Sequence, residues 1–405
     1  MTAQTAHGGY PYRNEIVISP TALFATLALF ILHITPKIGT LGALGFLIVG
    51  CFLILRQPWR SRDEIVDMWW LLALPGWTVL SVLWSDAPAL SLRYGILLTF
   101  TFMVAILIAR RLSPLNYYKA VFYSFAAVNV ISAVLGRERA DGLGFLGIFH
   151  SKNAMASTAS MLLISAAPLF FDRSLPRWLR YSGVAMTLLA ALLLVKAQSV
   201  GAILASVGAL AVAVGIVLLS RTSAWKRFFL LVMMSMLLLL VVLLIMANFS
   251  HVESWFFHST GKDVTLTGRT DLWAIAIRQI AERPVLGTGF QAFWIPGQPV
   301  AEEIWAQFGI ASKSGFHFHN TLLTNAVELG LPFALLQTGL VFWAGYVVIV
   351  WAIRDVRAET IFFAAFMIRQ FVLSLVEVTY FFQFDPITVI TVGAMVYAIR
   401  LRRGE

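Results

Sequence analysis

The segment from Phe316 to Gly330, FHFHNTLLTNAVELG, holds the side chains of this chain that are best suited to proton transfer. It contains His317 and His319, and Asn320 follows directly. A neutral imidazole can accept a proton at physiological pH, which makes His319 the candidate general base. The alternative is an interfacial histidine that only solvates the end of a loop. The polar residues that follow favour the catalytic interpretation.

Polar side chains recur along the rest of this segment at the spacing of a helix. If a helix begins near His319, then Thr321, Asn325 and Glu328 share one stripe. A polar stripe at the outer end of a membrane helix suggests a wetted cavity, with Asn320 and Glu328 as supporting polar groups. His319 would then lie in the first turn, where the helix dipole keeps an imidazole neutral.

Three cationic side chains lie far from the histidines in the sequence and are candidates for binding an anion. In GIFHSKNAMAS, Ser151 can cap a helix, Lys152 follows in its first turn, and the polar Asn153 comes next. A cation there opposes the helix dipole unless an anion binds. Lys196 interrupts two apolar runs, and Arg269 begins an amphipathic segment. The alternatives are a Lys152 that reaches to lipid headgroups and a surface turn at Lys196.

Arg369 lies in the middle of an apolar run near the C-terminal end of the chain. An ionisable group at that depth in a bilayer needs a partner, and Glu377 and Glu328 are the candidates. We favour a structural ion pair over a contact with substrate, so Arg369 is a supporting polar residue.

A metal site or cofactor site is not predicted. His317 and His319 form an HxH pair, but two ligands at this spacing are a weak signal, and no carboxylate-rich cluster is near them in sequence. The sequence contains no Walker loop, no HExxH and no CxxC spacing.

The composition places these residues in a membrane protein. Of the 405 residues, 59% are hydrophobic and 12% are charged, whereas about a quarter of an ordinary soluble domain is charged. One cysteine, Cys51, excludes an intrachain disulfide. The net charge of +10 is spread over short loops without interleaved aromatics, so membrane topology explains it better than nucleic acid does.

Apolar runs predict an all-α, polytopic integral membrane protein of about twelve spans. The runs begin near Ile16, Ile38, Met68, Tyr94, Tyr117, Asn153, Tyr181, Val200, Phe228, Leu331, Thr360 and Pro386. We divide the chain into residues 1–248 with spans one to nine, a large periplasmic loop at 249–318, and residues 319–405 with spans ten to twelve. Thr267 or Gly268 can cap an amphipathic helix in the loop that Pro284 ends, with Trp273, Ile277 and Ile280 on one face.

The distribution of lysine and arginine predicts the orientation of these spans. With the N-terminus inside, the inner segments hold eighteen of these residues and the short outer loops hold six. Positive residues favour the cytoplasmic side, so both termini are predicted to be cytoplasmic. Lys152, Lys196, Arg269 and His319 then meet at the outer face. Cations and one base beside a membrane suit an anionic, lipid-linked substrate, because they can stabilise a leaving diphosphate and activate a hydroxyl.

At these residues the sequence resembles the O-antigen ligase and polymerase superfamily, most of all its exopolysaccharide-polymerase branch. The resemblance is carried by GIFHSKNAMA, by TGRTDLW followed by RPVLGTGFQAFW, and by HNTLLTNAVELG, in that order over most of the chain. The family pattern of His-Asn and a later Gly is met by His319, Asn320 and Gly330. Phe333 stands where a second Gly is usual, and Val200 where the family often has an arginine, so Lys196 and Arg369 are the two candidates for that arginine's place.

The resemblance implies a metal-independent membrane glycosyltransferase of the C type in the bacterial inner membrane, with its active site on the periplasmic face. The donor would be a glycan on undecaprenyl diphosphate, and the acceptor a sugar hydroxyl on a second lipid-linked unit or on lipid A-core. His319 would activate the acceptor and Arg269 would bind the donor diphosphate, to which we add Lys152 and Lys196. A polymerase of exopolysaccharide or O-antigen is the first hypothesis and a ligase the second. A transporter or flippase is the third, but it needs a charged path through the midplane.

Overall fold

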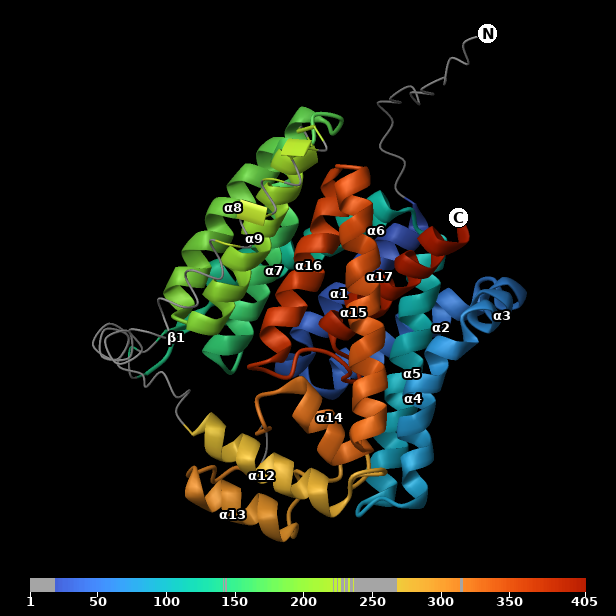
Figure 1. The fold of residues 1–405 in the computed structure, drawn as a ribbon, viewed down its shortest axis with the longest axis vertical. Coiled ribbons are helices and arrows are strands. Elements are labelled where there is room, and N and C mark those ends of the chain that lie inside the picture. Colours follow the sequence, from blue (N-terminus) through green and yellow to red (C-terminus); the bar gives the residue numbers. More distant parts are fainter. Residues whose placement is uncertain are drawn as a thin grey trace.

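A computed structural model describes residues 19–220 apart from positions 141 and 143, residues 268–313 and 316–405, and scattered positions between 222 and 236. The described chain is almost entirely helical (Figure 1). In the described residues the helices are interrupted by one antiparallel pair of short strands, β1 (Arg137–Glu138) and β2 (Phe145–Gly147). The prediction of an all-α chain is therefore confirmed in its coarse form.

The elements are given in chain order. The first part of the chain forms α1 (Pro20–Ile38), α2 (Thr40–Leu55), α3 (Pro58–Asp67), α4 (Trp69–Leu80), η1 (Ser81–Leu83), α5 (Pro88–Arg111) and α6 (Pro114–Leu135). After the strands follow α7 (Lys152–Phe171), α8 (Arg177–Ala197) and α9 (Val200–Ser220). The last part forms α12 (Arg269–Glu282), α13 (Pro299–Gln307), α14 (Thr321–Leu329), α15 (Leu331–Arg354), α16 (Ala358–Ser374) and α17 (Pro386–Arg403).

Seven described helices are long and apolar enough to cross a membrane, or eight if the bent pair α2 and α3 is counted as one span. The chain is thus a multi-pass membrane protein. All the predicted span starts except those near Ile16 and Phe228 fall in or next to a described helix, and these two lie outside the described residues. The number of candidate spans is smaller than twelve because some of the helices are too short or too charged, as with α4, α16 and α17.

The centre of the bundle is formed by α16 and α17, which other helices surround (Figure 1). Ala364 and Ala365 of α16 and Gly393 of α17 leave room for close helix neighbours. At Gly393 a Cβ would lie 2.2 Å from the Tyr117 hydroxyl of α6, so a larger residue has no space there. Apolar packing thus fixes α16, and with it the segment that follows α16 toward the candidate site.

Three helices at one end of the bundle, α12, α13 and α14, form a separate layer that we call the cap layer (Figure 1). It has its own apolar core, in which Leu272 of α12, Trp305 of α13 and Val327 of α14 pack together. The predicted division at residue 319 stays a prediction, since α14 packs both with the loop helices and with α15. Gly330 separates α14 from α15 along the chain.

The predicted amphipathic helix of the loop is present as α12. Gly268 is its N-cap with a left-handed φ of 77°, and the helix ends at Glu282, two residues before Pro284. Its buried face differs from the expected one, since Leu272 and Ala276 are buried while Ile277 is 58% exposed.

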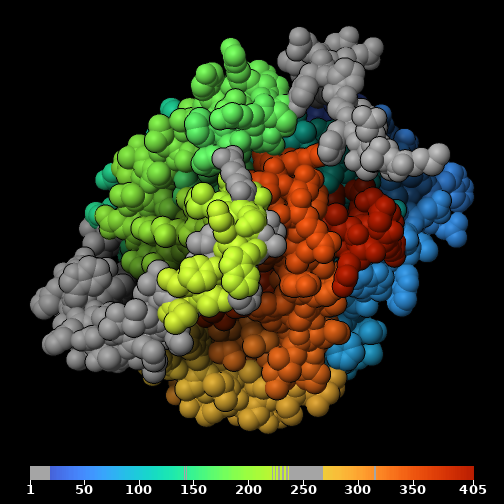
Figure 2. Space-filling model, turned by 45° about the horizontal axis from the view of Figure 1, so that its top comes forward, coloured from blue at the N-terminus to red at the C-terminus, as the bar shows by residue number. Residues whose placement is uncertain are grey.

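The opposite end of the bundle is rich in arginine, and we call it the arginine-rich end. Here α2, α5, α7, α15 and α17 finish. Arg403 pairs with Asp67 at 2.8 Å, and the Ala358 N–H donates to Asp172 Oδ2 at 3.0 Å, so distant segments meet at this end. In Figure 2 the gold cap layer forms the lower edge of the molecule, and blue α3 projects at the right.

Candidate functional site

Glu377, in the segment after α16, is the centre of a cluster at the base of the cap layer. Its Oε1 accepts a hydrogen bond from Arg269 Nη2 at 2.9 Å, and its Oε2 lies 3.0 Å from His319 Nδ1. His317 Nε2 lies 4.0 Å from the same Oε2. The four side chains keep between 20% and 29% of their surface exposed. We call these residues the Glu377 cluster.

Arg269 reaches this cluster because it is the first residue of α12. Its Nη1 donates to the Val376 carbonyl at 2.6 Å, so the guanidinium is held by the backbone and by the Glu377 carboxylate together. Gly268 can adopt its left-handed turn at no steric cost, and this turn aims the start of α12 at the cluster. A side chain at 268 would also strike Phe308, since a Cβ there would lie 2.5 Å from the ring.

His319 lies just before α14 and not in its first turn, so that part of the prediction is wrong. Asn320 is the N-cap, and its Oδ1 accepts from the Leu323 N–H at 3.0 Å. His319 has a left-handed φ of 51°, which is uncommon outside glycine, and its N–H donates to His317 Nδ1 at 3.1 Å. The turn points the imidazole of His319 at Glu377 instead of along the helix.

Asn320 and Thr321 tie α14 to the segment that carries Glu377. Asn320 Nδ2 donates to the Leu375 carbonyl at 3.1 Å, and Thr321 Oγ1 donates to the Glu377 carbonyl at 2.9 Å. The Thr379 N–H donates back to Thr321 Oγ1 at 3.2 Å. These bonds fix the Glu377 backbone relative to His319, and Asn320 takes part in this arrangement through the Leu375 carbonyl.

Asn153 connects α7 to the same cluster. Its Nδ2 donates to Glu377 Oε1 at 3.4 Å, and its Oδ1 accepts from Ser199 Oγ at 3.2 Å. Ser151 is the N-cap of α7, as the sequence predicted, with its hydroxyl accepting from the Ala154 N–H. Lys152 therefore begins α7 directly beside Asn153, with its stem against the backbone of Gly144.

Lys196 makes its contacts with the strand pair. Its ammonium lies 3.6 Å from Glu138 Oε1 and 4.9 Å from the centre of the Phe145 ring. Nearly half of its side chain is exposed. The ion pair with Glu138 means that an anionic ligand would have to compete for this lysine, so its place in a diphosphate site stays a prediction.

Arg369 is fully buried but does not form the expected ion pair with Glu377 or Glu328. Its Nε donates to Ser160 Oγ at 2.8 Å, and its Nη2 donates to Ser157 Oγ at 2.7 Å. Ser157 is one helical turn below Asn153 on α7. Hydroxyl and carbonyl oxygens thus solvate this guanidinium from inside the protein, directly beneath the Glu377 cluster.

The residues of the polar stripe of α14, which was predicted to face a wetted cavity, are buried in protein contacts. Asn325 Nδ2 donates to Gln337 Oε1 at 2.7 Å, and Glu328 Oε2 accepts from the Gln291 N–H at 2.9 Å. Burial raises the pKa of Glu328 to about 8, although the Gln291 hydrogen bond opposes that shift. Glu328 therefore stabilises the cap layer and does not touch the Glu377 cluster among its described contacts.

The electrostatics of the cluster keep the carboxylate charged and one imidazole neutral. Burial alone would raise the pKa of Glu377, but the hydrogen bond with His319 and the positive charge of Arg269 lower it below its usual value. Burial lowers the pKa of His317 to about 4, and the neighbouring His319 and Arg269 add to that shift. His317 is therefore neutral at physiological pH, and Glu377 is an ionised acceptor.

Two histidines and a carboxylate are also a possible metal-ligand set. One ligand atom from each of His317, His319 and Glu377 lies within 4.8 Å of the others. No carboxylate-rich cluster lies near the HxH pair in sequence, but the fold brings the single carboxylate of Glu377 to it from 58 positions away. The donor set fits a metal poorly, however, since the Glu377 oxygens already accept from Arg269 and His319, and the adjacent guanidinium would repel a cation.

The arrangement of the cluster is suited to general-base chemistry on a hydroxyl. With Nδ1–H donated to the ionised Glu377, the free Nε2 of His319 is the proton acceptor. Arg269 keeps part of its fork of N–H donors for an anion. A hydroxyl and an anionic leaving group can therefore be held on either side of one reacting carbon.

Sequence reasoning proposed His319 and Arg269 as site residues, which the fold brings together, but gave Glu377 a different role, as a partner for Arg369. Glu377 is 58 positions from His319 and 108 from Arg269, so no local spacing connects them. One signal was available, since an acidic residue just after an outward-running span falls on the same side of the membrane as the loop histidines.

Comparison with known proteins agrees with the resemblance that the motifs indicated. Residues 184–338 match the protein-family model described as O-antigen ligase. The chain is 29% identical over 336 residues to the exopolysaccharide production protein ExoQ of Rhizobium meliloti (strain 1021), covering 81% of this chain and 75% of that protein. The predicted resemblance to the O-antigen ligase and polymerase proteins is thereby confirmed. The family match contains Arg269, His319 and Gly330, whereas Glu377 lies beyond it.

Proposed function

We propose that this chain is a membrane glycosyltransferase that polymerises undecaprenyl-diphosphate-linked repeat units into exopolysaccharide or O-antigen. The observation that carries the proposal is the Glu377 cluster, in which one carboxylate holds His319 at 3.0 Å and Arg269 at 2.9 Å. The name of the relative, an exopolysaccharide production protein, supports a role in polysaccharide synthesis.

In the proposed reaction, a hydroxyl oxygen of the acceptor sugar attacks the anomeric carbon of the donor glycan. His319 Nε2 takes the hydroxyl proton, and the bond between the anomeric carbon and the diphosphate oxygen breaks. The electron pair of that bond leaves with undecaprenyl diphosphate, whose charge Arg269 stabilises. Direct attack inverts the anomeric centre, and Glu377 stabilises the imidazolium that forms on His319.

The three other predicted cations, Lys152, Lys196 and Arg369, contribute to the proposed site to different extents. Lys152 begins α7 beside Asn153 and can extend the donor site from Arg269. Lys196 contributes only if an anion displaces Glu138 from it. Arg369 is the better candidate for the cation that replaces the arginine usual at Val200, because it is fully buried and contacts Ser157 of α7, whereas nearly half of the Lys196 side chain is exposed.

We further propose that the cluster faces the periplasm and that both termini are cytoplasmic. The concentration of arginine at the opposite end of the bundle supports this orientation. The proposal assigns no metal to the reaction, because a guanidinium already occupies the place where a metal would stabilise the leaving diphosphate. The partners are membrane lipid and lipid-linked glycans, and not nucleic acid.

A ligase that transfers finished glycan to lipid A-core is the second candidate, and the family description favours it. The same cluster would serve both reactions, since each joins a sugar hydroxyl to a lipid-linked glycan. A transporter fits less well, because all three side-chain nitrogens of Arg369, the deepest charged group among the described residues, donate to neighbours inside the bundle.

The experiment that separates these candidates uses the purified full-length chain, a lipid-linked repeat unit and excess EDTA. The proposal predicts products longer than one repeat, with no requirement for added metal. Transfer only to an added lipid A-core acceptor would replace the polymerase by the ligase. Loss of all product in EDTA, restored by a divalent ion, would overturn the metal-independent mechanism.

A further inference from the structure

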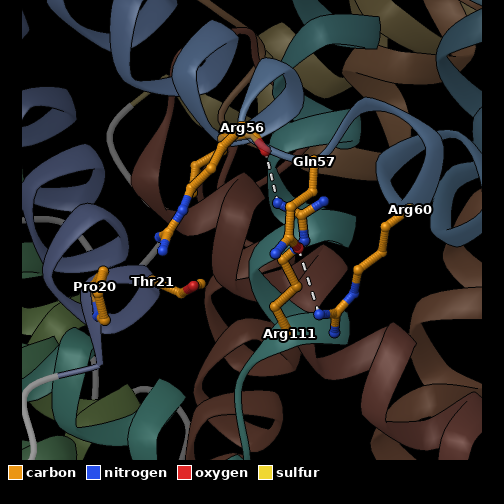
Figure 3. Close-up of a pocket in the computed structure, with 7 residues that line it drawn as sticks. Pro20, Thr21, Arg56, Gln57, Arg60 and Arg111 are labelled. Carbon is orange, nitrogen blue, oxygen red and sulfur yellow. Dashed lines mark hydrogen bonds between the residues drawn. The ribbon is translucent and has the colours of Figure 1, made fainter.

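The arginine-rich end of the bundle contains a groove that the proposed reaction does not use. Its volume is about 120 Å³, and Figure 3 shows its labelled lining residues. The lining comes from the start of α1, the end of α2, the start of α3 and the end of α5: Pro20, Thr21, Leu53, Arg56, Gln57, Arg60 and Arg111. Three of these residues are arginines, and none is acidic.

The floor of the groove is a built arginine site. Arg111 keeps only 6% of its side chain exposed, and its three nitrogens donate to Glu64 Oε2 at 2.7 Å, Ser61 Oγ at 2.7 Å and the Leu53 carbonyl at 2.6 Å. These bonds hold the guanidinium in one orientation before any ligand binds. Burying a charged side chain in this way is costly unless its charge is used or compensated.

The positive charge of the arginines in this groove is only partly neutralised by carboxylates. Glu64 is shared, since its Oε1 also accepts from Arg60 Nε at 2.9 Å. Arg56 is exposed, and within the part of the chain that the structure describes no carboxylate pairs with it. Three arginines and one glutamate leave the groove with an excess of two positive charges. In Figure 3 the guanidinium of Arg56 points toward Thr21, across the groove from Arg60.

The groove opens where the chain would meet the membrane surface. The axis of α3 is bent by 98° from that of α2, so if α2 crosses a bilayer, α3 lies nearly in its surface plane. Leu55 and Trp59, on either side of the bend, are 70% and 76% exposed. An exposed tryptophan beside basic residues is typical of a segment at the level of lipid headgroups.

We infer that this groove binds the phosphate of an anionic phospholipid, with Arg56 and Arg60 on its rim and Arg111 in its floor. The acyl chains would leave past Leu55 and Trp59 into the bilayer. A bound lipid would clamp the bend between α2 and α3 at the end of the molecule opposite the Glu377 cluster. The site is therefore independent of the proposed transfer reaction.

Native mass spectrometry of the delipidated, full-length protein tests this inference with phosphatidylglycerol and phosphatidylcholine of equal chain length. Phosphatidylglycerol is expected to bind more tightly. Arg56→Gln and Arg60→Gln are each expected to weaken it by about fivefold, the usual effect of one basic side chain near an anionic lipid. Arg62→Gln is the matched control, because Arg62 is exposed on the same helix but does not line the groove.

Three results would overturn the inference. Equal binding of the two lipids would mean that the net charge of the headgroup does not contribute to binding. A loss with Arg62→Gln as large as that with Arg56→Gln would mean diffuse surface attraction and no defined site. Displacement of bound phosphatidylglycerol by excess inorganic phosphate would make a free anion, and not a membrane lipid, the ligand. Since Arg56 and Arg62 are both exposed, neither substitution removes a buried contact.

Discussion

At the scale of the residue, Glu377 makes two interactions that compete in the proposed reaction. It holds His319 Nδ1, as the proposed transfer requires, and it also pairs with Arg269, for which the proposed donor diphosphate would have to compete. The lowered pKa of Glu377 keeps its carboxylate charged for the interactions with both His319 and Arg269. Entry of the donor would shift Arg269 from the carboxylate to the diphosphate and leave Glu377 to His319 alone.

Glu377→Gln is expected to lower kcat by about a hundredfold, within the usual range for general-base catalysis, because an amide stabilises an imidazolium poorly. KM for the lipid-linked donor should stay constant or fall, since Arg269 loses a competing carboxylate. Steady-state kinetics with the purified protein give both constants. Asp86→Asn is the control, because Asp86 pairs with Arg283 at 2.6 Å outside the Glu377 cluster. A raised KM with unchanged kcat would contradict this role.

The roles of residues that depend on near neighbours in the sequence could be predicted. The roles of residues that depend on contacts between distant segments could not. Ser151 was identified as a helix cap because capping depends on neighbours three residues away. His319 was recognised by its type and by its motif, but its left-handed conformation was not foreseen. Glu377 and the neutral partners of Arg369 depend on contacts between distant segments, which no spacing in the sequence encodes.

At the scale of the element, the motif RPVLGTGFQAFW is a strap that clamps the end of α14. The N–H groups of Thr288 and Gly289 donate to the carbonyls of Val327 and Glu328 at 3.0 and 2.8 Å. Helix ends leave such carbonyls without partners, and the strap supplies them. Two motifs that are separate in sequence therefore form one structural unit that positions His319.

Gly330 is the point where this strap passes closest to the chain. Its φ is 87°, and a Cβ would lie 1.9 Å from the Val285 carbonyl oxygen. Gly330→Ala is expected to destabilise the protein by more than ~3 kcal/mol, beyond the usual cost of a point mutation. Gly339→Ala, in α15 with nothing within 4 Å of its Cβ, should be neutral or slightly stabilising. Thermal unfolding in detergent compares the two variants, and equal midpoints would refute the clamp.

Phe333 shows why the second glycine of the family pattern is not needed here. It is buried at the start of α15, where its ring stacks on Trp77 at 6.1 Å between centres and contacts Phe381 at 5.8 Å. An aromatic core fills the space that a glycine would leave open. The departure from the pattern changes the packing behind α14 and leaves the Glu377 cluster intact.

At the scale of the whole molecule, the two ends of the bundle have opposite characters. The cap layer and the Glu377 cluster occupy one end, and the arginine-rich end carries α3 and the C-terminus. Hydropathy and the distribution of lysine and arginine between the predicted spans favoured this polarity. The form of the cap layer was not predictable, because α13 and α14 are short and part of their apolar surface packs against each other and α12 in a separate small core.

The proposed orientation is tested by labelling in intact spheroplasts. Cys51 is first changed to serine, and Glu282→Cys in α12 and Arg402→Cys in α17 are then made separately, each at an exposed position. A membrane-impermeant maleimide is expected to label position 282 at once and position 402 only after the membrane is opened. The reverse pattern would place the Glu377 cluster in the cytoplasm and contradict the proposed use of an exported donor.

The most direct test of the central claim compares His319→Ala with His150→Ala in the polymerisation assay. His150 is exposed at the same end of the bundle and contacts the Pro36 carbonyl, outside the Glu377 cluster. If His319 Nε2 takes the acceptor proton, His319→Ala lowers the rate by about 10²–10⁴-fold at unchanged protein level, while His150→Ala keeps it. Full activity of His319→Ala would contradict the account.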